Sequence, residues 1–192
     1  MTKIAIVTGS VRSGRQSLNI ANWAKSIADA RTDAEFEVVD IADFKLPVWD
    51  EALPPRMAPS EKDVTKAWAS KVDEFDGYIF IVSEYNHSIT GALKNALDYL
   101  SVEFEDKAAG FISYGSVGGA RAVEHLRGIL SEMGAAHVRN QVTMGLASDF
   151  ENYSVFTPTQ YSTSSVLPLV DQVISWSKAM ESVRENQAPL AA

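Results

Sequence analysis

The stretch KIAIVTGSVRSGRQSLNIANWAKSIA, residues 3–28, joins an apolar β-rich run, a turn rich in Gly and Ser, and an amphipathic segment. The run at 3–8 predicts a strand, and the apolar positions after Ser17 recur at helical spacing, which predicts a helix over 17–30. A strand followed directly by a helix begins a βα unit, and βα units form parallel sheets covered by helices. The stretch therefore predicts an α/β fold.

Four more apolar runs alternate with helical patterns along the rest of the chain. We expect strands at 35–41, 77–83, 109–114 and 137–144, and helices at 60–74, 91–100, 119–133 and 165–185. Because several of the strands are almost wholly apolar, they are expected to be buried on both faces, as in a parallel sheet. Two architectures fit: a flavodoxin-like sheet of order 2-1-3-4-5, or half of a classical dinucleotide-binding fold.

The composition indicates one globular domain. With 192 residues, 46% of them hydrophobic, the chain can bury a sizeable core, and we expect one domain over residues 1–186 and a disordered tail at 187–192. The absence of cysteine excludes disulfides, thiolate metal sites and cysteine nucleophiles. A formal net charge of −8 argues against a nucleic-acid partner. No apolar run approaches the roughly 20 residues of a membrane span and no signal peptide is evident, so we expect no membrane partner and a cytoplasmic location.

The first βα turn, TGSVRSGRQS (8–17), has the chemistry of a phosphate site. Parallel sheets bind ligands at the carboxyl ends of their strands, where a helix N-terminus offers free N–H groups. Residues 3–28 contain no Asp or Glu, although the chain as a whole is acidic. The turn matches neither G-x-x-x-x-G-K-[ST] nor G-x-G-x-x-G, which favours a monophosphate on a carried cofactor. The alternative is a polar turn that caps the helix. The candidate ligands are Ser10, Arg12, Arg15, Gln16 and Ser17.

Two further turns are expected at the same edge of the sheet. SEYNHSITGALKNALDYL (83–100) follows the third strand, and its Tyr85 and Asn86 are suited to flank a flat ring that forms hydrogen bonds. SYGSVGGARAVEHLR (113–127) follows the fourth strand, and its glycines allow close approach of the backbone to a ligand. Each turn taken alone is also compatible with a simple helix start.

Three segments together resemble the NADPH-dependent FMN reductases, a family of flavodoxin-like proteins that includes quinone, azo-dye and chromate reductases. The segments are GSVRSGRQS (9–17), EYNHSITGALKNALD (84–98) and SYGSVGGARA (113–122). The resemblance implies a three-layer α/β sandwich with a five-stranded parallel sheet of order 2-1-3-4-5. It implies FMN bound by Ser10, Arg12, Gln16 and Ser17 at the phosphate, by Glu84, Tyr85, Asn86 and His87 along the ring, and by Ser116, Gly118 and Gly119 over it; Arg15 and Val117, within the same turns, are assigned to the cofactor as well.

The function implied by this resemblance is hydride transfer from NADPH or NADH through FMN to a small acceptor: a flavin, a quinone, an azo compound or a metal oxyanion. Neither a catalytic acid or base nor a metal is expected, because the flavin carries the chemistry. The alternatives are a flavodoxin-type electron carrier and a flavin-binding protein without turnover. Family members commonly have Pro where this chain has Ser83 and often at Thr90, and these departures are expected to loosen the second turn.

The resemblance also implies a homodimer or homotetramer that associates through the helix containing Leu93 to Leu100. The polar and aromatic segment 145–165 is expected to be either a lid or an interface arm. Phe150, Tyr153 or Phe156 within it, or alternatively the segment Pro47 to Pro59 with Trp49, would shape an acceptor pocket.

Overall fold

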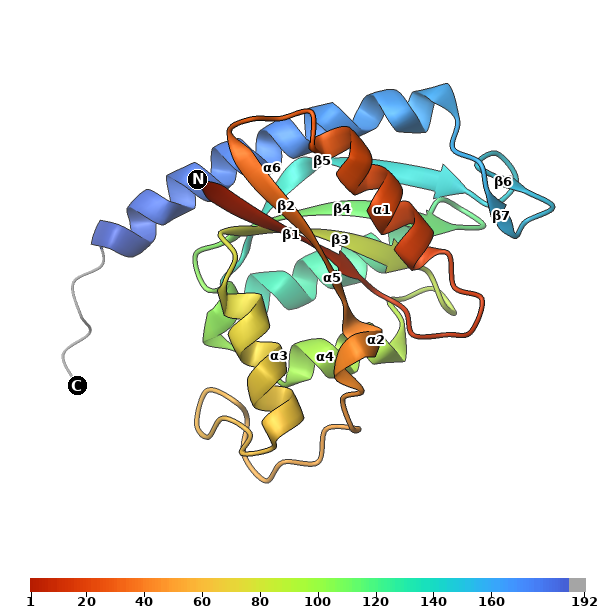
Figure 1. Cartoon of the computed structure of the whole chain (residues 1–192). Coiled ribbons are helices and arrows are strands. Elements are labelled where there is room, and N and C mark those ends of the chain that lie inside the picture. The colour runs from red at the N-terminus through yellow and green to blue at the C-terminus, as the bar shows by residue number, and fades with distance from the viewer. Residues whose placement is uncertain (187–192) are drawn as a thin grey trace.

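A computed structural model describes residues 1–186, and the expected tail at 187–192 lies outside the described residues. The chain forms a five-stranded parallel sheet of order β2-β1-β3-β4-β5, which confirms the flavodoxin-like prediction (Figure 1). The strands are β1 (Thr2–Thr8), β2 (Ala34–Asp40), β3 (Gly77–Ser83), β4 (Ala108–Gly115) and β5 (Ala136–Gly145). The helices are α1 (Ser17–Ala28), α2 (Ile41–Phe44), α3 (Asp63–Asp73), α4 (Gly91–Asp98), α5 (Ala120–Glu132) and α6 (Gln160–Asn186), with a 3₁₀ turn at Val102–Phe104.

Helices cover both faces of the sheet and bury a separate core on each. One core packs α1 and α6 against one face, and the other packs α3, α4 and α5 against the opposite face. Every residue of β3 and β4 is buried. Because strand side chains alternate, Ile79 and Ile81 of β3 enter the first core, while Tyr78 and Phe80 enter the second. This two-sided burial explains why the central strands are apolar throughout.

A small residue in β4 lets α6 pack closely on the sheet. A Cβ at Gly110 would lie 2.6 Å from Val173 Cγ2 and 2.8 Å from Leu169 Cδ1, both on α6. Any larger residue would push the helix away from the sheet. Within residues 1–186, α6 and the other helices are all too short or too polar to cross a membrane.

Several expected boundaries were wrong by a few residues. The helix expected from 60 begins at Asp63, because the Ser60 hydroxyl donates to Glu51 Oε1 at 2.7 Å instead of capping the helix. The helix expected from 165 begins at Gln160, where Thr159 Oγ1 accepts the Ser162 N–H at 3.2 Å. The segment before it contains a short antiparallel hairpin of β6 (Phe150–Glu151) and β7 (Val155–Phe156).

The parallel topology gathers the turns after β1, β3 and β4 at one edge of the sheet. The β6–β7 hairpin follows β5 and lies at this same end of the molecule, to the right in Figure 1. The three predicted turns and the hairpin therefore form the environment in which a ligand site is to be sought.

Candidate functional site

The turn after β1 is anchored to the neighbouring strand through Gly9. The Gly9 N–H donates to Ile81 O at 2.9 Å, and a Cβ on residue 9 would lie 2.6 Å from that oxygen. The Thr90 hydroxyl donates to Gly9 O and accepts the Leu93 N–H at 3.0 Å, so it also caps α4. Thr90 thus ties the first turn to the second.

The first and second turns meet at Tyr85. Its hydroxyl lies 3.0 Å from Ser10 Oγ and accepts a hydrogen bond from Arg12 Nε at 2.9 Å. Ser10 and Ser17 are both buried, and Ser17 is the first residue of α1. Gln16 precedes it and accepts the Asn19 side-chain N–H at 2.9 Å. A guanidinium, buried hydroxyls and a helix N-terminus therefore share one small volume, which is the donor set that phosphate oxygens require.

Arg15 points elsewhere within the same turn. Its guanidinium pairs with Asp40 at the end of β2, and Asp40 also accepts the Thr8 hydroxyl at 2.8 Å and the Ala42 N–H at 3.0 Å. The sequence pattern did not reveal this carboxylate, because it comes from a different strand. Arg15 neutralises Asp40, which leaves Arg12 as the cation that faces the site.

The second turn has an unusual backbone. Tyr85 and Ser88 exchange two hydrogen bonds, at 2.9 and 3.1 Å, and φ is positive at both Asn86 (48°) and His87 (75°). Positive φ at both central residues is the signature of a type I′ turn, which Asn-Gly normally occupies. The turn directs His87 toward α5, where its ring centroid lies 5.9 Å from that of His125. His87 is thus exposed beside α5.

Glu84 carries a buried oxygen without a partner. The side chain is 4% exposed, and its Oε1 accepts from Arg121 Nε at 2.7 Å. Oε2 finds no hydrogen-bond partner in the described part of the chain. Buried polar atoms are almost always satisfied, so this oxygen indicates a missing donor. A flavin supplies one, because its ring N–H and ribityl hydroxyls are donors.

The third turn approaches β4 too closely for side chains. Gly118 and Gly119 both have φ of +74°, and a Cβ on Gly119 would lie 2.8 Å from Tyr114 N. The Ser113 hydroxyl donates to Gly118 O at 2.7 Å and fixes the turn. Ser116 and Val117 are exposed at its tip. The turn can therefore present backbone groups to a ligand, with Ser116 and Val117 at the rim.

These elements enclose a cavity of about 280 Å³. Its walls include Arg12 and Gln16 of the first turn, Glu84 and Tyr85 of the second, Tyr114 of β4 and Tyr153 of the hairpin. This volume is near the lower end of the roughly 300–1,000 Å³ typical of ligand pockets. The other predicted residues do not form its walls: Ser10, Arg15, Ser17, Asn86, His87, Ser116, Val117, Gly118 and Gly119.

Tyr114 was missed because it belongs to a strand that the sequence presents only as apolar. Burial raises the pKa of its hydroxyl, while a hydrogen bond from Ser83 Oγ at 2.6 Å opposes that shift. The phenol therefore stays neutral at physiological pH. The Ser83 hydroxyl thereby links β3 to β4.

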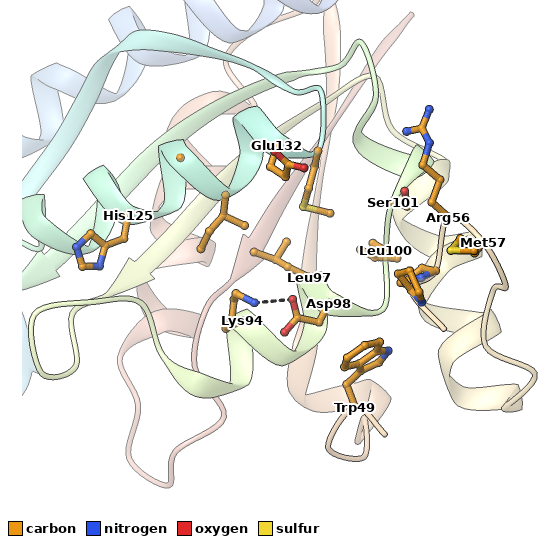
Figure 2. Close-up of a pocket in the computed structure, with 15 residues that line it drawn as sticks. Trp49, Arg56, Met57, Lys94, Leu97, Asp98, Leu100, Ser101, His125 and Glu132 are labelled. Carbon is orange, nitrogen blue, oxygen red and sulfur yellow. Dashed lines mark hydrogen bonds and ion pairs between the residues drawn. The ribbon is translucent and has the colours of Figure 1, made fainter. Parts of the chain in front are cut away.

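A larger cavity of about 1090 Å³ lies between the 47–59 segment, α4 and α5 (Figure 2). Its lining comes from the sides of helices and from a proline-rich segment, and Lys94 and Asp98 pair across its edge at 2.6 Å. The Trp49 Nε1 in its lining is also buried without a hydrogen-bond partner among residues 1–186, but the cavity offers no helix N-terminus. The smaller cavity is therefore the better candidate for a phosphorylated cofactor. Within residues 1–186, no cluster of three His, Asp or Glu side chains could hold a metal ion.

The sequence of the chain matches a known protein family. A family model described as NADPH-dependent FMN reductase matches residues 2–149, which is well over half of the chain. The chain belongs to the NADPH-dependent FMN reductase family. The matched region contains all three turns of the candidate site and the sheet that carries them.

Curated relatives carry names consistent with this FMN reductase family. An NAD(P)H-dependent FMN reductase of Nectria is 43% identical over 128 residues, which is 64% of this chain and 64% of the relative. One of Schizosaccharomyces pombe is 38% identical over 133 residues, or 67% and 66% of the two chains. A quinone reductase of Escherichia coli is 32% identical over 151 residues, or 74% and 78%. The match spans just under two thirds of the length of the first two relatives.

Solved structures share the fold of this chain. The NAD(P)H:(acceptor) oxidoreductase FerB of Paracoccus denitrificans aligns with a TM-score of 0.73 at 20% identity, covering 94% of this chain and 99% of FerB. Oxidised flavodoxin 1 of Bacillus cereus aligns with a TM-score of 0.57 at 18% identity, covering 91% and 98%. At such identities the likeness shows the shared fold.

The third turn makes a stability prediction. Gly119→Ala is expected to destabilise the protein by clearly more than the about 1–2 kcal/mol that positive φ costs an L-residue, since its Cβ would collide with backbone atoms. Gly134→Ala is the matched control, because Gly134 has φ of +73° and its Cβ would lie no closer than 3.3 Å to a flexible Glu105 atom. Urea unfolding of both variants measures the difference. Equal losses of stability in the two variants would contradict the close approach at Gly119.

Proposed function

We propose that this protein is an NAD(P)H-dependent FMN oxidoreductase that reduces a small-molecule acceptor. The observation that carries the proposal is a single cavity bordered by the anion-binding turn after β1 and by the unpaired Glu84 oxygen after β3. An anion-binding turn beside a buried hydrogen-bond acceptor suits a cofactor that carries both a phosphate and a ring with N–H groups. Membership of the FMN reductase family supports the same assignment.

The proposed ligands follow the three turns. Ser10, Arg12, Gln16 and Ser17 hold the FMN phosphate, and Arg15 assists by neutralising Asp40. Glu84, Tyr85, Asn86 and His87 border the ring, and the turn of Ser116, Val117, Gly118 and Gly119 covers it. The Tyr85 hydroxyl already accepts a hydrogen bond from Arg12 Nε and lies 3.0 Å from Ser10 Oγ, where either oxygen can donate. A phosphate in this turn would compete with it for Arg12.

Bound FMN would supply the redox chemistry, because it can take a hydride from a reduced nicotinamide and pass the electrons to the acceptor molecule. The chain's own residues bind, orient and shield it. Arg12 supplies positive charge, the type I′ turn fixes the Tyr85 backbone, and the buried Tyr114 excludes water from the base of the cavity. Proximity of this kind can lower a barrier by several kcal/mol without an acid or base.

Reduction under anaerobic conditions tests the proposal. The FMN-loaded protein is mixed with NADPH and, separately, with NADH without oxygen, and the visible absorbance band of the flavin is followed. We expect the band to be lost with at least one reductant, and steady NAD(P)H consumption once a quinone is added. A flavodoxin-type carrier would bind FMN but consume neither nucleotide. Failure to bind FMN at all would overturn the cofactor assignment itself.

A homo-oligomer forms part of the proposal, with the groove of Figure 2 as its contact surface. In the segment Leu93 to Leu100 that was expected to mediate association, Leu93 and Leu97 of α4 and Leu100 beyond its end are at most 4% exposed, so these leucines offer little accessible surface. The groove instead offers Trp49 and the 72% exposed Met57. An apolar surface of this kind suits a second copy of the chain. The cytoplasmic location expected from the sequence stays a prediction.

Light scattering after size-exclusion chromatography measures the assembly. We expect the wild-type protein to elute as a dimer or tetramer, and Met57→Glu to shift it toward monomer, because a charge would be buried in the contact. Val48→Glu is the control, since Val48 is 82% exposed but lies outside the groove. A monomeric wild-type protein would contradict the assembly, and an unaffected Met57→Glu variant would contradict this surface.

A further inference from the structure

The segment between β5 and α6 is a hairpin with a fixed base. Asp149 is 3% exposed and accepts the Thr159 N–H at 3.0 Å and the Ser162 hydroxyl at 2.6 Å, both at the start of α6. It also accepts the Ser148 hydroxyl at 2.7 Å. Burial opposes ionisation of Asp149, but the hydrogen bonds from Ser148, Ser162 and Thr159 outweigh it and lower the carboxyl pKa. The base of the hairpin is therefore held in one position.

Aromatic contacts hold the two short strands against the body of the protein. The Phe150 ring centroid lies 5.8 Å from that of Tyr114 in β4 and 5.5 Å from that of Phe156. Phe156 in turn packs edge-on against Trp23 of α1 at 5.3 Å. These rings lie within the range of favourable aromatic pairs. Both strands of the hairpin are thus anchored close to the candidate site.

The tip of the hairpin adopts a conformation that its residues disfavour. Asn152 and Tyr153 have φ of 50° and 58°, and the Ser154 N–H donates to Glu151 O at 3.1 Å. Asn suits this backbone, but the second position of such a turn strongly favours Gly, and a bulky residue there is an outlier. The Tyr153 side chain is 71% exposed, so burial does not offset the cost. Because the strained backbone at Tyr153 is not offset by burial of its side chain, we look for a functional reason for the strain.

Tyr153 lies at the edge of the candidate site. Tyr153 and Ser154 form part of the wall of the same cavity as Arg12, Glu84 and Tyr85. The exposed ring therefore lies on the solvent-accessible side of the candidate FMN site. Phe150 at the hairpin base lies 5% exposed on the inner side of the cavity, so the hairpin contributes both a buried and an accessible aromatic face.

We propose that Tyr153 is a specificity-determining residue, whose ring provides an outer face against which a planar aromatic acceptor such as a quinone lies. The assignment rests on the proposed FMN oxidoreductase function and narrows its substrate class. A flat ring gains dispersion and quadrupole interactions from an aromatic face, whereas a metal oxyanion gains neither. The hairpin thus favours quinone-like acceptors over inorganic ones.

Three variants distinguish the contribution of the Tyr153 ring from that of the turn conformation. Tyr153→Asn removes the aromatic face but keeps a side chain that tolerates positive φ. Tyr153→Phe keeps the ring and loses only the hydroxyl. Val155→Asn is the matched control, because Val155 is 56% exposed on the same hairpin but does not border the cavity. Thermal unfolding checks that each variant folds, and titration of FMN fluorescence checks that each still binds the cofactor.

The main readout is equilibrium binding of a naphthoquinone to the oxidised, FMN-loaded protein without reductant, measured by calorimetry. We expect Tyr153→Asn to weaken binding by about 2- to 12-fold, the range that corresponds to one aromatic pair. Tyr153→Phe and Val155→Asn should bind as the wild type does. In turnover, Tyr153→Asn should raise KM for the naphthoquinone by a larger factor than KM for ferricyanide.

Unchanged naphthoquinone binding in Tyr153→Asn, or equal weakening in Val155→Asn, would overturn the role of Tyr153. An equal rise in KM for naphthoquinone and for ferricyanide would also overturn the role of Tyr153, because it would indicate a general defect of the enzyme. These outcomes are distinct from failure of the proposed function. In that case the wild-type protein itself would bind no FMN or consume no NAD(P)H.

Discussion

The candidate site depends on the close contact of two backbones at Gly9. Its N–H bonds to Ile81 O of β3, its carbonyl accepts from the Thr90 hydroxyl, and a Cβ at this position would strike Ile81 O. Parallel topology alone would bring the turns after β1 and β3 to the same edge of the sheet. The contact at Gly9 brings them together closely enough for Arg12 and Tyr85 to form a hydrogen bond.

The carboxylates near the candidate site are neutralised by ion pairs with arginine side chains. Asp40 and Glu84 both lie at the carboxyl edge of the sheet, where a phosphate would be repelled by free carboxylates. Arg15 pairs with Asp40 and Arg121 with Glu84, so each carboxylate has its own guanidinium. Among the described residues, Arg12 by contrast bonds to the neutral side chains of Ser10 and Tyr85. An acidic protein can thus present a local positive charge to an anion.

The sequence predicts the sheet well because β3 and β4 are apolar throughout, which only two-sided burial explains. It also predicts the three turns, since their Ser, Arg and Gly residues follow the strands directly. It could not predict that Arg15 faces Asp40, because that pairing depends on the contact between β1 and β2. The start of α6 and the hairpin before it were missed, because a polar segment of short strands lacks a periodic pattern.

The central claim is that the turn after β1 binds the phosphate of FMN. The most direct test compares the dissociation constants of FMN and riboflavin, which differ only in that phosphate, for the wild type and for Arg12→Ala. Charge-assisted hydrogen bonds from this turn predict that FMN binds the wild type about 100-fold or more tightly than riboflavin, and that the ratio falls markedly in Arg12→Ala. Equal affinity of the wild-type protein for FMN and riboflavin would contradict the account.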